Sequence, residues 1–271
     1  MRRPLLVAAG GLLLCVLAAI ASRAVSAKAA TQNSASACER TLLMNFEDFR
    51  HGEAVNEVPI WQSPAPSDSL DDASAVFFQA GMTIDADGAP NAYNPQNTGL
   101  DDISNAGVPG HWDGVVQDEN GDPYIQGPDD PFPGYYVSCT SLCDRSKRSI
   151  DPRRYVDASK IPYVVLPGGL AREAGMRLGD FALVVNLRNG SSSYAIYADV
   201  GTLGEGSIAL ADNLEIHSDA RVGGTRGGIF YIIFPGSGNG SPRTVEEINS
   251  EAAAHVNLWG GIERVNACLM N

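Results

Sequence analysis

Residues 181–211 read FALVVNLRNGSSSYAIYADVGTLGEGSIALA, and this stretch decides the expected fold. Two apolar runs rich in β-branched and aromatic residues flank an Asn-Gly dipeptide, which favours tight hairpin turns, so an antiparallel strand pair is predicted. A third apolar run follows at 206–211 and is also predicted to be a strand. Asp199 and Glu205 lie at the two ends of the glycine-bounded turn before it, although their surroundings indicate buried strands.

The spacing of these two acids predicts that they share one face of the sheet. If the runs around the turn form a plain hairpin, the five residues between Asp199 and Glu205 place the two acids opposite each other, with Cβ atoms about 5 Å apart. Such a pair can act as acid and base, because partial burial and mutual repulsion raise the pKa of one carboxyl. The alternative is two solvated turn residues, and the strand pattern alone favours neither.

The rest of the chain predicts one mainly β domain with a helix at its end. Short apolar runs bounded by Pro or Gly predict further strands at 134–142, 154–167 and 228–238. Thr244 and Glu247 have the spacing of a capping box at the start of a helix. The helical face that follows consists of Val245, Ile248, Ala252, His255 and Val256. We therefore expect a mainly β (α+β) fold, a single barrel-like domain with a C-terminal helix.

The N-terminal part of the chain predicts export. Residues 1–30 contain two arginines, an apolar run from about 5 to 20 and then small residues, which is typical of a secretory signal peptide. A membrane anchor is the alternative, but the run is short for a span. Residues 31–75, rich in Ser, Ala, Pro and Asp, predict an N-terminal arm or linker, and 76–271 the functional domain. We expect a secreted, extracellular protein.

The net charge of the chain is −13, and it becomes −17 once the four basic residues of the signal peptide are removed. Such an acidic protein repels nucleic acid and anionic membranes, so neither is an expected partner, whereas polycations are attracted. The alternative interpretation is that the negative charge serves only to keep the protein soluble.

Four cysteines remain after the signal peptide, and an even number in an exported protein suggests two disulfides. Three connectivities are open. Cys139 and Cys143 are close enough in sequence for a local bridge, which would leave Cys38 to pair with Cys268.

No metal or cofactor is expected. Asp87 and Asp118 lie in loops rich in Asp, Asn and Gly, but neither loop completes the EF-hand pattern, so both are interpreted as turn residues. The chain also lacks a Gly-x-Ser-x-Gly element and a phosphate-binding loop.

Four segments, 110–142, 151–167, 179–216 and 229–238, resemble the glycoside hydrolase family 75 chitosanases. The most specific pieces are IPYVVLP and YADVG…GEGSIALA, and the resemblance extends from about residue 82 to 238. It implies secreted, endo-acting, metal-free hydrolysis of the β-1,4 bonds of chitosan with inversion. It also implies that Asp199 and Glu205 are the catalytic pair. Because Glu205 is nearer the apolar run at 207–211, we expect it as the general acid and Asp199 as the base that activates water. Fungal members have a longer loop between the two acids, which leaves the carboxylate separation open here.

The resemblance also suggests which residues meet the substrate. Chitosan is a polycation, so carboxylates and aromatic platforms are expected along the site. The candidate substrate contacts are Asp85, Asp87, Tyr136 and Asn186, and further possible platforms are Tyr93, Trp112 and Tyr135. Taken alone, each of these is more readily interpreted as a turn or core residue than as a ligand contact, because aromatic residues in strand-like runs usually pack inward.

The order of elements looks similar to a double-psi β-barrel, in which the segments after Asp199 cross over and form no plain hairpin. We expect a monomer that acts on chitosan. The alternatives are a non-catalytic protein that binds cell-wall glycans, and a hydrolase of another amino-sugar polymer.

Overall fold

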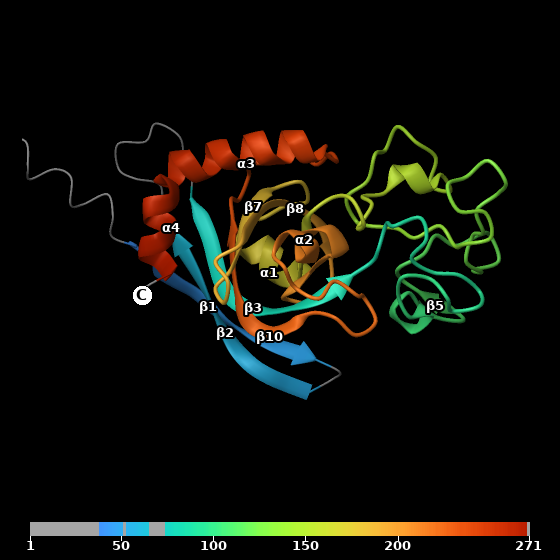
Figure 1. Ribbon diagram of the computed structural model, residues 1–271, viewed down its shortest axis with the longest axis horizontal. Helices are drawn as coiled ribbons and strands as arrows, with labels where there is room; N and C mark the ends of the chain where they lie inside the picture. Colours follow the sequence, from blue (N-terminus) through green and yellow to red (C-terminus); the bar gives the residue numbers. More distant parts are fainter. Residues whose placement is uncertain (1–37, 51–52, 65–73, 270–271) are drawn as a thin grey trace, which may run out of the picture. The chain divides into compact units, whose positions relative to one another are not determined.

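The computed structural model describes residues 38–50, 53–64 and 74–269 (Figure 1), so the predicted signal peptide lies outside the described residues. In this part of the chain six strands close into a barrel, in the order β3-β10-β7-β8-β6-β9 and back to β3. Their bounds are β3 Ala75–Asp85, β6 Tyr163–Leu166, β7 Phe181–Asn186, β8 Ser192–Val200, β9 Glu205–Ser207 and β10 Thr225–Ile233. The β3–β9 and β6–β8 pairs are parallel. The expected mainly β, barrel-like domain is confirmed.

Side chains alternate between the inside and the outside of this barrel, as the period of two in a strand requires. On β6, for example, Val164 and Leu166 pack inside the barrel, whereas Tyr163 and Val165 belong to a second apolar cluster on its outer face. Burying each large apolar side chain stabilises the fold by roughly 1.5–3 kcal/mol. Strand β6 is therefore apolar on both faces.

The segment predicted to be an N-terminal arm contains two long strands. β1 (Thr41–Arg50) and β2 (Glu53–Ser63) form an antiparallel pair, and β2 also pairs with β3 at the edge of the barrel. Val58 and Ile60 of β2 are buried in the barrel core cluster. The described part of 31–75 thus extends the sheet.

The hairpin predicted around Asn189-Gly190 is confirmed as the antiparallel pair of β7 and β8. The strand predicted at 206–211 is wrong: β9 ends at Ser207, and helix α2 (Ile208–Asn213) follows. The Ser207 hydroxyl accepts a hydrogen bond from the Leu210 backbone N–H, which caps the helix and ends the strand. The plain hairpin across the Asp199–Glu205 turn is also wrong, because β6 lies between β8 and β9.

The C-terminal helix and its capping box are confirmed. α3 (Val245–Trp259) begins after Thr244, whose hydroxyl accepts from the Glu247 N–H while the Glu247 carboxylate accepts from the Thr244 N–H. α3 packs across β7 and β8 (Figure 1) and is followed by α4 (Gly261–Leu269). α1 (Gly168–Glu173) is a short helix after β6. Within the described residues, no helix is long and apolar enough to cross a membrane.

The long connection from β3 to β6, residues 86–162, has little regular structure and lies beside the barrel, drawn in green in Figure 1. Its elements are η1 (Ile103–Asn105), β4 (Gly107–Val108), β5 (His111–Trp112) and η2 (Pro152–Arg154). The turn at Asp118 is confirmed, because its carboxylate accepts from the backbone N–H groups of Asn120 and Asp122. This connection, called the long loop below, covers the outer face of β6 and β8.

One of the two predicted disulfides is present. Cys38 and Cys268 are bonded, which joins two positions 230 residues apart in sequence. The local bridge between Cys139 and Cys143 is not formed. The Cys139 thiol points to the Asp113 carbonyl oxygen at 3.6 Å, and the Cys139 N–H donates to the Gly114 carbonyl. Cys139 is therefore held by residues 113 and 114 of the same long loop.

Replacing Cys268 with Ser is expected to lower the free energy of unfolding by about 2–5 kcal/mol, because the cross-link restricts the unfolded chain. Chemical denaturation of both proteins measures the difference. Peptide mapping without reduction should find Cys38 linked to Cys268 and the thiols of Cys139 and Cys143 free. A Cys139–Cys143 link in that map would contradict the structure.

Candidate functional site

A β-bulge in strand β8 sets the direction of Asp199. Tyr197 pairs with Val164, but the next pair across β6 joins Asp199 to Val165, so Ala198 is left out of the ladder. Simple alternation after the inward Tyr197 and outward Ala198 would point Asp199 into the barrel. The extra residue of the bulge turns it to the outer face instead, beside Val165. The Ala198 carbonyl, freed from the ladder, accepts from the Leu142 N–H of the long loop at 2.8 Å.

Glu205 lies on the same outer face, on the other side of β6. Val165 pairs with Asp199 on β8 and with Glu205 on β9. Residues directly across neighbouring strands point to the same face of a sheet, so the two acids flank Val165. Two strand spacings of roughly 4.8 Å separate their Cα atoms by about 9.6 Å. The pair is therefore wider than the cross-strand distance that a plain hairpin would give.

Asp199 is held through one of its two carboxylate oxygens. Oδ1 accepts from the Ser141 hydroxyl at 2.6 Å, from the Ser141 N–H at 3.0 Å and from the Val200 N–H at 2.8 Å. Among the described residues, Oδ2 has no hydrogen-bond donor. Asp199 is 8 % exposed, and burial raises its pKa, whereas the hydrogen bonds from Ser141 and Val200 oppose this shift. One oxygen is thus fixed and the other can accept a proton.

Glu205 is half-buried and closes the turn that precedes it. Its Oε2 accepts from the Thr202 N–H at 2.9 Å. Gly201 lies against this carboxylate: a Cβ at that position would come within 2.8 Å of Oε2 and 2.9 Å of Val165 Cγ1. A hydrogen bond from the Thr83 N–H to the Gly204 carbonyl joins this turn to β3. The glycine lets the backbone approach the carboxylate closely.

The structure brings Asp85 to the same cluster. Asp85 ends β3 opposite Ser207, two residues beyond the pair of Thr83 and Glu205. Burial, followed by the charges of Asp199 and Glu205, raises the pKa of Asp85 to about 8. Asp85 is therefore mainly protonated at neutral pH, and it shares one electrostatic environment with both acids.

Asp87 follows on the same turn. Its N–H donates to Asp85 Oδ1 at 2.8 Å, and its own carboxyl Oδ1 lies 2.7 Å from the hydroxyl of Tyr93. Burial raises the pKa of Asp87 well above its ordinary value, and the charges of Asp85 and Asp199 raise it further. The side chains of Asp85, Asp87, Asp199 and Glu205 thus form one carboxyl cluster.

The other two candidate contacts lie elsewhere. Tyr136 is half-buried in the long loop, where its ring is 6.3 Å from that of Trp112 in a tilted arrangement. Asn186 ends β7 next to the β7–β8 turn, and its amide donates to the Leu214 carbonyl. The adjacent pair Val185–Ser192 is seven residues before Asp199 along β8, or about 20 Å. The structure does not bring Asn186 to the carboxyl cluster.

Sequence reasoning missed three polar partners of the cluster. Ser141 orients Asp199 from the long loop, Tyr163 of β6 donates its hydroxyl to the Asp87 carbonyl at 3.0 Å, and Tyr93 bonds Asp87. Tyr93 was considered only as a platform, yet it is 2 % exposed and cannot stack on a ligand. The contacts of Ser141 and Tyr163 have no sequence signal, since they span 58 and 76 residues, whereas Tyr93 and Asp87 are only six residues apart.

A groove opens beside Asp199. Two surface cavities, of about 470 and 590 Å³, share Cys143, Arg145, Asn239 and Gly240 in their walls, and the first is also lined by Ser141. The guanidinium of Arg177 at its side donates to the Gly236 and Gly238 carbonyls. Arg145 and Arg177 make the wall of the first cavity basic, and Ser141 in the same wall donates its hydroxyl to Asp199.

Within the described ranges, no group of three or more His, Cys, Asp and Glu side chains has the geometry to hold a metal ion. In comparisons with known proteins, the chain matches no family model and no curated protein sequence.

Thermal stability is expected to fall as the pH rises from about 5 to 8. Asp85 has a pKa near 3.8 when unfolded and about 8 when folded, so in this interval the folded state keeps a proton that the unfolded state has lost. Raising the pH therefore favours unfolding until the folded pKa is passed. Asp85→Asn should flatten the dependence of melting temperature on pH. The exposed Glu119, changed to Gln, is the control, and an equal slope in both variants would contradict the assignment.

Proposed function

We propose that this chain is a secreted glycoside hydrolase, an endo-acting chitosanase that cleaves β-1,4 bonds with inversion. The observation that carries the proposal is the placement of Asp199 and Glu205 on one outward face with a single strand between them. Inverting enzymes need carboxyl groups roughly 6.5–9.5 Å apart to leave room for a water, whereas retaining enzymes need about 5–5.5 Å. The wider spacing favours inversion. The resemblance to family 75 chitosanases points to the same pair.

Asp199 suits the role of general base. Three donors on Oδ1 hold the carboxylate in one orientation and favour its ionised form. Oδ2 can then accept a proton from a water molecule as the water oxygen attacks the anomeric carbon. Since inversion requires the water to approach from the face opposite the leaving group, the base and the acid must lie on opposite sides of the scissile bond.

Glu205 is the proposed general acid. Its side chain reaches the outer face from the neighbouring side of β6 and is anchored at Oε2 by the Thr202 N–H. In the reaction it gives its proton to the glycosidic oxygen as the bond from that oxygen to the anomeric carbon breaks. Water supplies the new hydroxyl and, through Asp199, one proton. Proton exchange with solvent then returns both carboxyls to their starting states.

Charge supports a cationic polymer as the substrate. The chain carries a net charge of −13, and four carboxyls gather in one cluster. A polymer that bears ammonium groups is attracted to a protein with such a net charge. Asp85 is neutral at mildly acidic pH and would meet the sugar as a hydrogen-bond donor. The Cys38–Cys268 disulfide is of the kind found in oxidising compartments outside the cytosol.

The purified protein, incubated with fully deacetylated chitosan, should cause a rapid fall in viscosity together with new reducing ends. Asp199→Asn and Glu205→Gln should each lower kcat by at least about 100-fold, because each removes an acid–base group. Chitin and peptidoglycan serve as comparison polymers. Binding to chitosan without new reducing ends would favour a non-catalytic glycan-binding protein, and cleavage of peptidoglycan alone would favour a different hydrolase.

Gly201→Ala tests the position of Glu205 without touching either acid. The added methyl would meet Glu205 Oε2 and Val165, so the carboxylate must move. We expect kcat on chitosan to fall by about 10-fold or more, since misplacing a catalytic group by about 1 Å can cost up to 100-fold. Gly169→Ala is the matched control, because a Cβ there meets no atom within 4 Å. Equal activity of both variants would contradict a catalytic Glu205.

A further inference from the structure

Tyr93 joins two carboxyls of the long loop, the half-buried Asp87 and the buried Asp101. Its hydroxyl lies 2.7 Å from Asp87 Oδ1 and 3.3 Å from Asp101 Oδ2. Tyr93 and Asp101 are 2 % and 3 % exposed, so water cannot replace these contacts. Asp87 belongs to the carboxyl cluster, whereas Asp101 lies further along the long loop, next to the 3-10 helix η1. The phenol is therefore a link between the cluster and the rest of the loop.

The number of protons available to Asp87, Tyr93 and Asp101 decides which of these groups is ionised. A phenol has one proton, so it can donate to only one of two carboxylates, and the other contact needs a proton from a carboxyl. Asp101 already accepts from the Asp102 N–H at 2.7 Å and from the Asn105 amide at 2.9 Å, which favours its ionised form. The only other contact of the Asp87 carboxyl within the described residues is the Ser138 hydroxyl at 3.4 Å. The extra proton therefore belongs on Asp87, which donates to Tyr93, and Tyr93 donates to Asp101.

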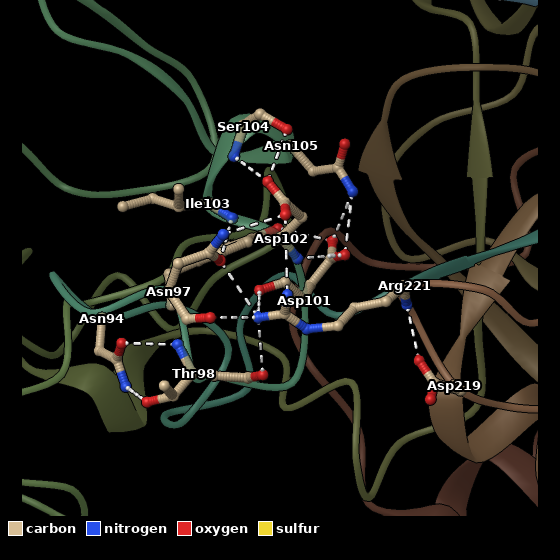
Figure 2. Close-up of polar contacts among 12 residues, drawn as sticks. Asn94, Asn97, Thr98, Asp101, Asp102, Ile103, Ser104, Asn105, Asp219 and Arg221 are labelled. Carbon is tan, nitrogen blue, oxygen red and sulfur yellow. Dashed lines mark hydrogen bonds and ion pairs between the residues drawn. The ribbon is translucent and has the colours of Figure 1, made fainter.

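Arg221 fixes the charged end of this series of hydrogen bonds, which is the end at Asp101. Figure 2 shows its guanidinium reaching the loop that bears Asp101, where it donates to the carbonyls of Asn97, Gly99 and Asp101 at 2.9, 3.2 and 2.9 Å. The Asn105 amide holds the Asp101 carboxylate from the other side. Arg221 follows α2 in sequence, so the segment that leaves the Glu205 side of the site returns to anchor the loop.

The other end of this series of hydrogen bonds is Asp87, whose backbone connects it to Asp85. The Asp87 N–H donates to Asp85 Oδ1 at 2.8 Å, and the Asp87 carbonyl accepts from the hydroxyl of Tyr163 at 3.0 Å. These two bonds orient the third carboxyl beside Asp199 and Glu205. If the Asp87 side chain lost its partner, the turn could move and the N–H bond to Asp85 would weaken.

We propose that Tyr93 is a positioning residue of the site: by linking Asp87 to Asp101, its hydroxyl fixes the turn that holds Asp85 beside Asp199 and Glu205. This inference rests on the proposed function, because it assigns Asp85 to the same site. Tyr93 acts through Asp87 and touches no substrate.

The titration of Asp85 reports this positioning, and several groups face it. The titratable and charged groups around Asp85 and the Tyr93 chain are Asp87, Asp101, Asp102, Asp199, Glu205, Tyr163, Cys139 and Arg221. Burial and then the charges of Asp199 and Glu205 raise the pKa of Asp85, whereas the Asp87 N–H and the Tyr163 hydroxyl lower it. Burial and the charges of Asp85, Asp199 and Asp101 raise the pKa of Asp87. Burial also raises the pKa of Asp101, and its hydrogen bonds and Arg221 oppose that shift. Losing the N–H bond should therefore move the titration of Asp85 to higher pH.

The test is ¹³C NMR of aspartate side-chain carboxyls over pH 4–10, with the Asp85 signal assigned by its loss in Asp85→Asn. In Tyr93→Phe the Asp85 midpoint is expected to rise by roughly one pH unit, the size of one hydrogen bond to a charged group. Tyr231→Phe is the matched control, since it removes a buried hydroxyl that donates to the Gly81 carbonyl at 2.8 Å. The alkaline limb of chitosan hydrolysis should shift with the Asp85 midpoint.

An unchanged Asp85 midpoint in Tyr93→Phe, or an equal shift in Tyr231→Phe, would overturn the inference. If Tyr93→Phe does not fold, the NMR titration of the wild type is the test. At least two aspartates, Asp85 and Asp87, must then still be protonated at pH 6. Ionisation of all aspartates at that pH would refute the proton assigned to Asp87. If the protein does not hydrolyse chitosan, the proposed function fails, but the NMR titration still measures what Tyr93 does.

Discussion

Strand β6 lies between the two strands that carry Asp199 and Glu205, and the arrangement of the site depends on this one constraint. Because β6 pairs with β8 on one side and with β9 on the other, a single residue of β6, Val165, lies opposite both acids. The bulge at Ala198 then turns Asp199 outward, where a regular strand would have buried it in the barrel. The backbone thus sets the separation of the two Cα atoms and the face to which both side chains point.

Keeping several carboxyls close together out of water is costly, and the long loop offsets part of that cost. Each carboxyl is either given donors, as Ser141 does for Asp199, or kept protonated, as at Asp85. The loop itself is held by the Leu142 N–H on the freed Ala198 carbonyl and by Arg221. An irregular segment of this length can hold such positions only because its polar groups are paired within it.

The sequence predicted the β class, the β7–β8 hairpin and the capping box of α3, since each depends on local periodicity or turn chemistry. It failed at 206–211, where an apolar run that looks like a strand follows a serine able to cap a helix. It also predicted that Asp199 and Glu205 share a face, but for the wrong reason, because local pattern cannot show a third strand between them. Ser141 and Tyr163 could not be found, since their contacts span 58 and 76 residues.

With β6 between Asp199 and Glu205, space remains for a water, and the proposed hydrolysis would therefore invert the anomeric carbon. Proton NMR of a chito-oligosaccharide digest, recorded before mutarotation, measures this directly. Cleavage of a β-1,4 bond should first release products with the α configuration at the new reducing end. Initial release of the β anomer would contradict the account, because it would require a retaining mechanism with carboxyls about 5–5.5 Å apart.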